Sequence, residues 1–294
     1  MVKMVIDEAF LAELEALQTI LKNNIAGMFG GNHQSKNFGS SCEFADYRDY
    51  MPGDDITKID WNVYARSDKL YQKLYLDERQ MHTKIYIDAS RSMEYGIPEK
   101  AEQALKIAAA IAYLSINEMD KVSIYAIHGG EIDEVISGMV GKDSYINCIN
   151  KLNELDFSGE AYISDAIVNS KIGMGDGYSV LISDFLTDED YERAIDKFAE
   201  KRRDILTVQI LSREELNPQY RGKMHFFDAE NANNIFRKKI DRDRINAYKS
   251  ALTFVTDKIK NYTNSRGGHY LLVPAHEKIS NVFFGNMTDL GVLK

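Results

Sequence analysis

Side chains that carry oxygen gather in one short segment of the chain, Asp88-Ala89-Ser90-Arg91-Ser92. Its carboxylate and two hydroxyls recur at every second residue, so an extended loop can point all three to one side. A further carboxylate, Asp184, comes shortly after the apolar run 178–182. Oxygen donors without Cys or His favour Mg²⁺, Mn²⁺ or Ca²⁺ over zinc or copper, so these residues predict a site for a hard divalent cation. The alternative is a Ser-rich loop in which one hydroxyl caps a turn.

The segments that must position these side chains alternate between strand and helix patterns. Strands are expected at 84–88, 122–127, 131–136, 178–182, 205–211, 225–227 and 269–273. Helices are expected at 98–114, 143–155, 188–201 and 245–262, and a further helix is expected to start near residue 163. Such alternation predicts an α/β fold with a doubly wound, mostly parallel sheet. Ligands of these sheets bind beyond the carboxyl ends of the strands, at the switch point, which places the expected site in the loops after Ile87 and Ile182.

The first part of the chain has a different pattern. An amphipathic helix is expected at 7–22, and an aromatic-dense block at 40–76 with a Pro52-Gly53 turn predicts a small β-rich subdomain. We therefore expect two domains, at 1–82 and 83–294. The block combines opposite charges with the only Trp of the chain, in the set Arg48, Asp54, Asp55, Asp60, Trp61 and Arg66. These residues predict a network of ion pairs and hydrogen bonds that fixes the small subdomain on the main sheet; direct contact with a partner is the alternative.

The composition excludes several classes of function. A formal net charge of −9 disfavours a general nucleic-acid role. The two cysteines, Cys42 and Cys148, are too far apart in sequence to indicate a disulfide framework or a CxxC zinc site. No stretch approaches the roughly 18 apolar residues of a membrane span, so we expect a soluble cytoplasmic protein.

The sequence also lacks the common catalytic motifs. There is no Walker A segment and no G-x-S-x-G elbow, and the six histidines are scattered without metal-binding spacing. A binding role is therefore favoured over catalysis. A metal-dependent hydrolase or phosphotransferase that uses Asp88 and Asp184 remains an alternative.

The D-x-S-x-S segment after one strand, together with Asp184 after a later strand, resembles the metal-ion-dependent adhesion site of von Willebrand factor A domains. The resemblance implies that Ser90 and Ser92 bind the metal directly and that a carboxylate of a partner completes its shell. It also implies a Thr from another loop.

That Thr is missing from the segment that resembles the corresponding loop, Gly159-Glu160-Ala161-Tyr162-Ile163, where Ala161 takes its place. Ser164 or Asp165 is a candidate substitute, although both also suit the capping of a helix. The resemblance with Ala161 in place of Thr implies a weakened cation site.

A second resemblance covers essentially the whole chain. The segments Arg48-Asp49-Tyr50-Met51-Pro52-Gly53-Asp54-Asp55 and Ile59-Asp60-Trp61, with Phe227-Asp228-Ala229-Glu230 near the end, resemble a bacterial family known as domain of unknown function 58. Its members are commonly encoded beside MoxR-type AAA+ ATPases. This implies a metal-ion-dependent protein-interaction module whose partner is such an ATPase or its client. A scaffold with a degenerate, metal-free site is the alternative, and Ala161 is its support.

Overall fold

The computed structural model describes residues 5–24, 34–38, 44–78, 80–175, 177–187, 190–219, 222–227 and 235–283. The chain divides into two compact units, one made of residues 30–80 and the other of residues 1–29 and 81–294. We call these the small unit and the main unit. Cys42 and residues 228–230 of the carboxy-terminal family pattern lie outside the described residues.

The main unit is built on a six-stranded sheet with the order β11-β8-β7-β4-β5-β6. The strands are β4 (His82–Asp88), β5 (Lys121–His128), β6 (Glu131–Met139), β7 (Tyr178–Ser183), β8 (Asp204–Leu211) and β11 (His269–Pro274). All neighbouring pairs are parallel except β5 with β6, which forms an antiparallel edge. The expected doubly wound, mostly parallel sheet is therefore confirmed.

The direction in which strands are added reverses between β4 and β7. These two strands are parallel neighbours with Ile87 opposite Ile182. Asp88 and Asp184 consequently leave the sheet at the same edge, at the switch point where such sheets bind ligands.

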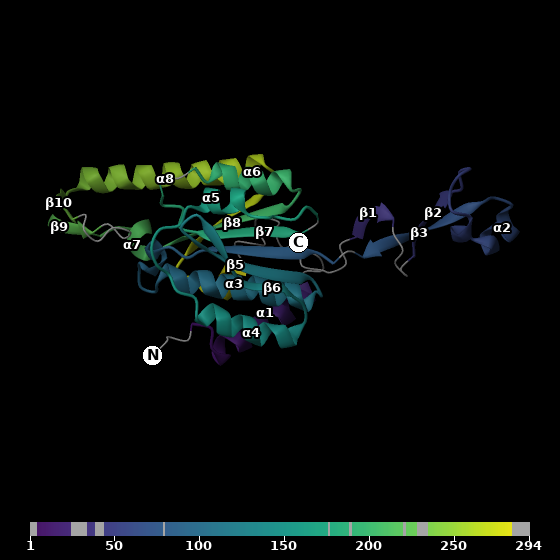
Figure 1. Cartoon of the computed structure of the whole chain (residues 1–294), viewed down its shortest axis with the longest axis horizontal. Coiled ribbons are helices and arrows are strands. Elements are labelled where there is room, and N and C mark those ends of the chain that lie inside the picture. The colour runs from purple at the N-terminus through teal and green to yellow at the C-terminus, as the bar shows by residue number, and fades with distance from the viewer. Residues whose placement is uncertain are drawn as a thin grey trace. The chain divides into compact units, whose positions relative to one another are not determined.

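Helices cover both faces of the sheet (Figure 1). One face carries α1 (Glu8–Asn24), α3 (Lys100–Asn117) and α4 (Lys142–Asn153), and the other carries α5 (Ile163–Asn169), α6 (Glu192–Glu200) and α8 (Arg242–Ser265). Successive residues of β4 point to opposite faces, so Ile85 and Ile87 join the first core while Tyr86 joins the second. Burial on both sides explains why the central strands are continuous apolar runs.

The amino-terminal helix α1 belongs to the main unit. Phe10, Leu14 and Leu17 lie in the same core as α3, and the Asn153 side chain accepts hydrogen bonds from the backbone N–H groups of Val5 and Ile6, both at 3.0 Å. The sequence analysis grouped this helix with the following subdomain, whereas the structure groups it with residues 81–294. Its apolar stripe is buried against α3, which is why α3 is apolar nearly all round.

Helix α8 is buried only over its carboxy-terminal half. Ile259 and Thr263 are buried, whereas Tyr248 and Phe254 are exposed. The sequence analysis predicted a helix at 245–262, and the structure buries its apolar side chains only toward the end beside β11.

The remaining elements of the main unit are short. They are the 3₁₀ helix η2 (Arg91–Glu94), α7 (Arg213–Leu216), α9 (Ile279–Asn281) and an antiparallel hairpin of β9 (Gly222–Phe227) and β10 (Ile235–Ile240). Of the helices formed by described residues, none combines the length and the apolar character needed to cross a membrane.

The small unit has an antiparallel sheet of order β1-β3-β2, from β1 (Gln34–Phe38), β2 (Phe44–Asp49) and β3 (Tyr71–Glu78). The predicted turn is present, since Asp54 N–H donates to Met51 O at 3.0 Å and Gly53 has φ of +108°. Between β2 and β3 lie the 3₁₀ helix η1 (Ile56–Lys58) and a helix that the sequence analysis missed, α2 (Trp61–Ser67). Asp60 caps α2 by accepting from the Asn62 and Val63 N–H groups.

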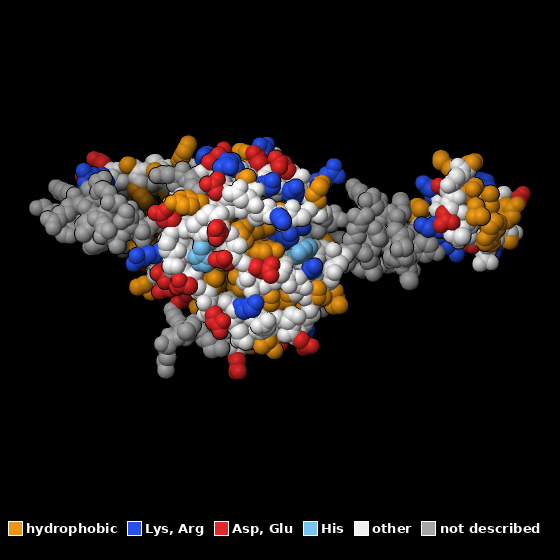
Figure 2. All heavy atoms as spheres, viewed as in Figure 1, with side chains coloured by type: hydrophobic (Ala, Val, Ile, Leu, Met, Phe, Trp, Pro, Cys, Tyr) orange, Lys and Arg blue, Asp and Glu red, His pale blue; other side chains and the backbone are white. Residues whose placement is uncertain are grey.

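Among the described residues of the predicted charged network, one pair forms within the set, and two other members contact residues outside it. Arg48 pairs with Asp54 at 2.8 Å, Asp55 accepts from Thr57, and Asp60 pairs with Lys73 at 3.1 Å. Trp61 and Arg66 are exposed on α2. Each of these contacts joins residues within the small unit, so a role in fixing it to the main unit stays a prediction. Figure 2 also shows apolar side chains gathered on its surface, and they include Tyr47, Met51, Ile56, Trp61, Tyr64 and Leu70.

Candidate functional site

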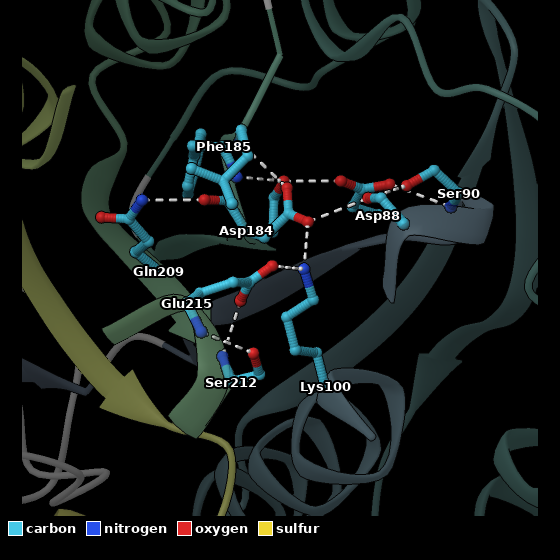
Figure 3. Close-up of polar contacts among 11 residues, drawn as sticks. Asp88, Ser90, Lys100, Asp184, Phe185, Gln209, Ser212 and Glu215 are labelled. Carbon is cyan, nitrogen blue, oxygen red and sulfur yellow. Dashed lines mark hydrogen bonds and ion pairs between the residues drawn. The ribbon is translucent and has the colours of Figure 1, made fainter. Parts of the chain in front are cut away.

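The structure brings together the four residues that the sequence singled out. Asp88 ends β4, Ser90 and Ser92 follow in the loop and in η2, and Asp184 follows β7. Asp88, Ser90 and Asp184 are buried, and Ser92 is partly exposed. The four side chains form one connected group of hydrogen bonds at the carboxyl edge of the sheet (Figure 3).

Asp88 uses both carboxylate oxygens to order the loops. Oδ1 accepts from Ser90 N–H at 2.9 Å, and Oδ2 accepts from the Ser183 hydroxyl at 2.5 Å. Burial raises the pKa of Asp88 to about 6, the negative charge of Asp184 adds to the rise, and the hydrogen bonds from Ser183 and Ser90 oppose it. Asp88 therefore fixes the D-x-S-x-S loop and the β7 loop together.

The oxygens of Ser90, Ser92 and Asp184 lie at successive short distances. Ser90 Oγ and Ser92 Oγ are 3.0 Å apart, and Ser92 Oγ donates to Asp184 Oδ2 at 2.9 Å. In an octahedral Mg²⁺ shell with metal–oxygen distances of about 2.1 Å, neighbouring ligands are about 3 Å apart. The donor types suit a magnesium-like cation, and the two spacings, which here are hydrogen-bond distances, equal those between neighbouring ligands of such a shell.

Two charged residues that the sequence analysis did not select also belong to this group. Lys100, the first residue of α3, places Nζ 2.6 Å from Asp184 Oδ2 and 2.7 Å from Glu215 Oε1 (Figure 3). Glu215 lies on α7, immediately after β8. The sequence did contain a signal for Lys100, because a positive side chain in the first turn of a helix is disfavoured by the helix dipole unless an acidic side chain neutralises it.

The Lys100 side chain is only 1% exposed. Burial alone would lower its pKa, but the carboxylates of Asp184 and Glu215 outweigh burial and raise it. The ammonium is therefore charged, and with three carboxylates (Asp88, Asp184 and Glu215) the group has a formal charge of −2 when all four are ionised.

The backbone around Asp184 is held from the neighbouring strands. Its carbonyl accepts from Gln209 Nε2 at 2.8 Å, and Gln209 Oε1 accepts from the Tyr270 hydroxyl at 2.6 Å. The next residue, Phe185, is fully buried with φ of +53°, a conformation that is rare for bulky side chains. The strand order thus fixes a strained turn that aims the Asp184 side chain at Ser92 and Lys100.

The loop that resembles the Thr loop lies beside the D-x-S-x-S segment. Arg91 N–H donates to Gly159 O at 3.0 Å, and Ser158 N–H donates to Ala89 O at 2.9 Å. Gly159 has φ of +68°, which favours glycine. Ala161, buried and bridged to Gly129, offers a methyl group where the resemblance implies a hydroxyl.

The two candidate substitutes for the Thr have partners elsewhere. The buried Ser164 hydroxyl donates to the backbone carbonyl of Asp190. The half-exposed Asp165 pairs with Arg193 at 2.9 Å. In the part of the chain that the structure describes, no cluster of three or more His, Cys, Asp or Glu is suited to hold a metal ion, so a cation here depends on the serine hydroxyls.

A family model matches residues 46–254, which is more than half of the chain. The chain belongs to the family described as "Protein of unknown function DUF58". Uncharacterized proteins of Mycobacterium bovis and Mycobacterium tuberculosis are 25% identical to this member over 229 residues, which cover 76% of this chain and 72% of each relative.

The solved structures to which the chain is similar include three with TM-scores between 0.34 and 0.40. An aerotolerance-related membrane protein of Bacteroides fragilis, with mutations to serine, has a TM-score of 0.40 at 16% identity and covers 72% of this chain and 96% of its own. The VWA domain of SpRpn10 has a TM-score of 0.40 at 13% identity and covers 70% and 94%. A manganese-loaded TRAP protein of Plasmodium vivax has a TM-score of 0.34 at 15% identity and covers 44% and 57%.

Proposed function

We propose that this chain is a protein-interaction module that binds its partner at the carboxyl edge of the six-stranded sheet, with the help of a divalent cation. The observation that carries the proposal is the convergence of Ser90, Ser92 and Asp184 oxygens at spacings of 3.0 and 2.9 Å. When bound, Mg²⁺ or Mn²⁺ would supply a positive point that attracts an acidic side chain of the partner.

The residues would divide the work between them. Ser90 and Ser92 would hold the cation through neutral oxygens, which leaves its charge available to the partner. Asp88 and Asp184 would orient its waters and balance its charge. Asp88 also fixes the loop through Ser183 and Ser90, so its removal is expected to disturb the whole group.

Apolar side chains in the same loops support a binding surface. Tyr95 and Ile97 follow the D-x-S-x-S segment, Tyr162 follows Ala161, and Leu186 follows Phe185. All four are exposed, and Ile97 is 88% exposed. Exposed aromatic and aliphatic side chains around a polar centre are typical of protein interfaces.

The partner that we propose to test first is a MoxR-type AAA+ ATPase, or a client of such an ATPase. Support for this choice comes from the family to which the chain belongs, whose members are commonly encoded beside these ATPases. The expected contact is an acidic side chain of the partner at the cation, surrounded by apolar contacts with the four loop residues.

The first experiment is titration calorimetry of Mg²⁺ and Mn²⁺ into the purified chain. Saturable binding is expected in the wild type and is expected to be lost in Asp88→Ala and in Ser90→Ala/Ser92→Ala. Ile97→Ser is the matched control, because it changes the surface without touching an oxygen donor. Absence of both binding heat and thermal stabilisation up to millimolar metal would contradict the cation site, since ligand linkage reveals even weak binding.

Capture of the ATPase then separates the candidate functions. Cation-assisted binding predicts capture that a chelator abolishes and that Ile97→Ser weakens with cation affinity unchanged. Capture that is indifferent to the chelator favours a metal-free scaffold, for which the methyl group of Ala161 is the supporting observation. Turnover of phosphoesters with Mg²⁺ or Mn²⁺ would favour the enzyme instead.

A further inference from the structure

Lys100 is a buried ammonium at the edge of the proposed cation site. It is the first residue of α3, where the helix dipole disfavours positive charge, and its side chain is 1% exposed. A buried charge of this kind persists only when it is paired. The carboxylates of the site must therefore neutralise the ammonium of Lys100, whether or not a metal ion is bound.

Both partners of the ammonium come from the loops of adjacent strands. Asp184 follows β7 and Glu215 follows β8, and Nζ lies 2.6 and 2.7 Å from their oxygens. The Asp184 oxygen in question, Oδ2, is the same atom that accepts the Ser92 hydroxyl. A divalent cation beside Ser92 and Asp184 would lie next to a fixed positive charge and would have to share this oxygen with it.

Glu215 is positioned to remain paired with the Lys100 ammonium when Asp184 interacts with a metal ion. Its Oε2 accepts from Ser212 N–H at 2.7 Å, and its own N–H donates to the Ser212 hydroxyl at 3.2 Å, which completes a capping box at the start of α7. Its Oε1 is left directed at Lys100. The carboxylate is thus fixed independently of Asp184.

We propose that Lys100 is a built-in competitor for the divalent cation at Asp184, and that cation binding leaves the ammonium paired with Glu215 alone. The inference rests on the proposed cation site and deepens it. Without metal, the ion pairs of Lys100 with Asp184 and Glu215 stabilise the site. Because these pairs compete with the metal ion, Lys100 lowers the affinity of the site for divalent cations.

The test compares the wild type with Lys100→Met/Glu215→Gln by titration calorimetry with Mg²⁺ and Mn²⁺. This pair of changes removes one charge of each sign, so the formal charge of the site stays at −2, with Asp88 and Asp184 remaining. Gln also serves at the third position of a capping box, which preserves α7. Lys142→Met/Glu154→Gln makes the same change of charge at two exposed positions and serves as the control.

The double variant is expected to bind Mg²⁺ about tenfold or more tightly than the wild type, because a charge-assisted hydrogen bond no longer competes for Asp184. The control is expected to bind like the wild type. The single variant Lys100→Met is expected to have a lower Tm in chelator and a larger rise in Tm with Mg²⁺ than the wild type. If this variant fails to fold, the double variant still carries the test.

The outcomes separate this inference from the proposed function. Equal Mg²⁺ affinity in the wild type and the double variant overturns competition by Lys100 and leaves the cation site in place. Binding in the double variant alone supports competition by Lys100 at the oxygen donors, and it overturns the proposed cation-assisted function of the wild type. Absence of binding in every variant overturns both proposals.

Discussion

Two side chains at opposite ends of β4, His82 and Asp88, are shifted by burial toward their neutral forms. Burial lowers the pKa of His82 to about 4, and the positive charges of Lys84, Arg203 and Lys121 add to the effect. Burial raises the pKa of Asp88 to about 6. At the scale of single residues, burial therefore disfavours the charged form of one titratable group at each end of β4.

The depressed pKa of His82 predicts a loss of stability in acid. The unfolded chain takes up a proton near pH 6.5 while the folded chain does so only near pH 4, so the free energy of unfolding falls as the pH drops through this window. His82→Gln keeps a hydrogen-bonding group for the Ser123 hydroxyl and removes the titration. Urea unfolding at pH 7 and pH 5 is expected to show a smaller loss for the variant than for the wild type.

Comparing the two proteins cancels other titrations, including that of Asp120, whose pKa burial raises to about 6 and which acts in the opposite direction. The same pH dependence in wild type and variant would rule out His82 as the source.

At the scale of secondary-structure elements, α1 completes the core of the main unit. Its buried residues Phe10, Leu14 and Leu17 pack on the face that α3 and α4 cover. Helix α3 is consequently enclosed by the sheet on one side and by two helices on the other, which leaves its small residues no room for larger ones.

Leu14→Ala is expected to destabilise the main unit by about 2–5 kcal/mol, since it opens a cavity at a fully buried position. The measurement is urea unfolding followed by circular dichroism. Ala16→Ser, on the exposed face of the same helix, is the control and is expected to change the stability by less than about 0.5 kcal/mol. Equal effects of the two changes would show that α1 does not pack as described.

At the scale of the whole molecule, the chain leaves the main unit after α1 and returns at β4, and the residues between form the small unit. Among the described residues, those that form the two apolar cores of the main unit and those of the candidate site all lie outside residues 30–80. The small unit is therefore an insertion between the first helix and the first strand of the sheet, with its own hydrogen-bonded sheet.

A chain in which a Gly/Ser linker replaces residues 30–80 is expected to fold and to bind Mg²⁺ with the affinity of the full chain. The reason is that the described residues of this segment belong to neither core of the main unit and supply none of the oxygen donors. Circular dichroism and calorimetry make the comparison. An unfolded product, or loss of Mg²⁺ binding with the fold intact, would mean that the small unit takes part in the site.

The sequence by itself determined the α/β fold, the six strands of the main sheet, the longer helices of the main unit and the pair of loops that carry the candidate site. These predictions succeeded because burial on two faces imposes apolar runs on the central strands, and because parallel strands deliver their following loops to one edge. The D-x-S-x-S segment could be selected because its oxygen donors recur at every second residue, and Asp184 because it directly follows an apolar strand.

Only the tertiary structure decided the partners that come from distant segments. Lys100 and Glu215 are 115 positions apart, and neither lies in a motif, so their ion pair with Asp184 could not be read from spacing. Likewise, the stripe of α1 indicated a buried face without naming its partner, and the stripe of α8 did not indicate where the core ends. Local patterns specify which residues are buried or polar, whereas the identity of the groups that neutralise a buried charge depends on which strands lie side by side.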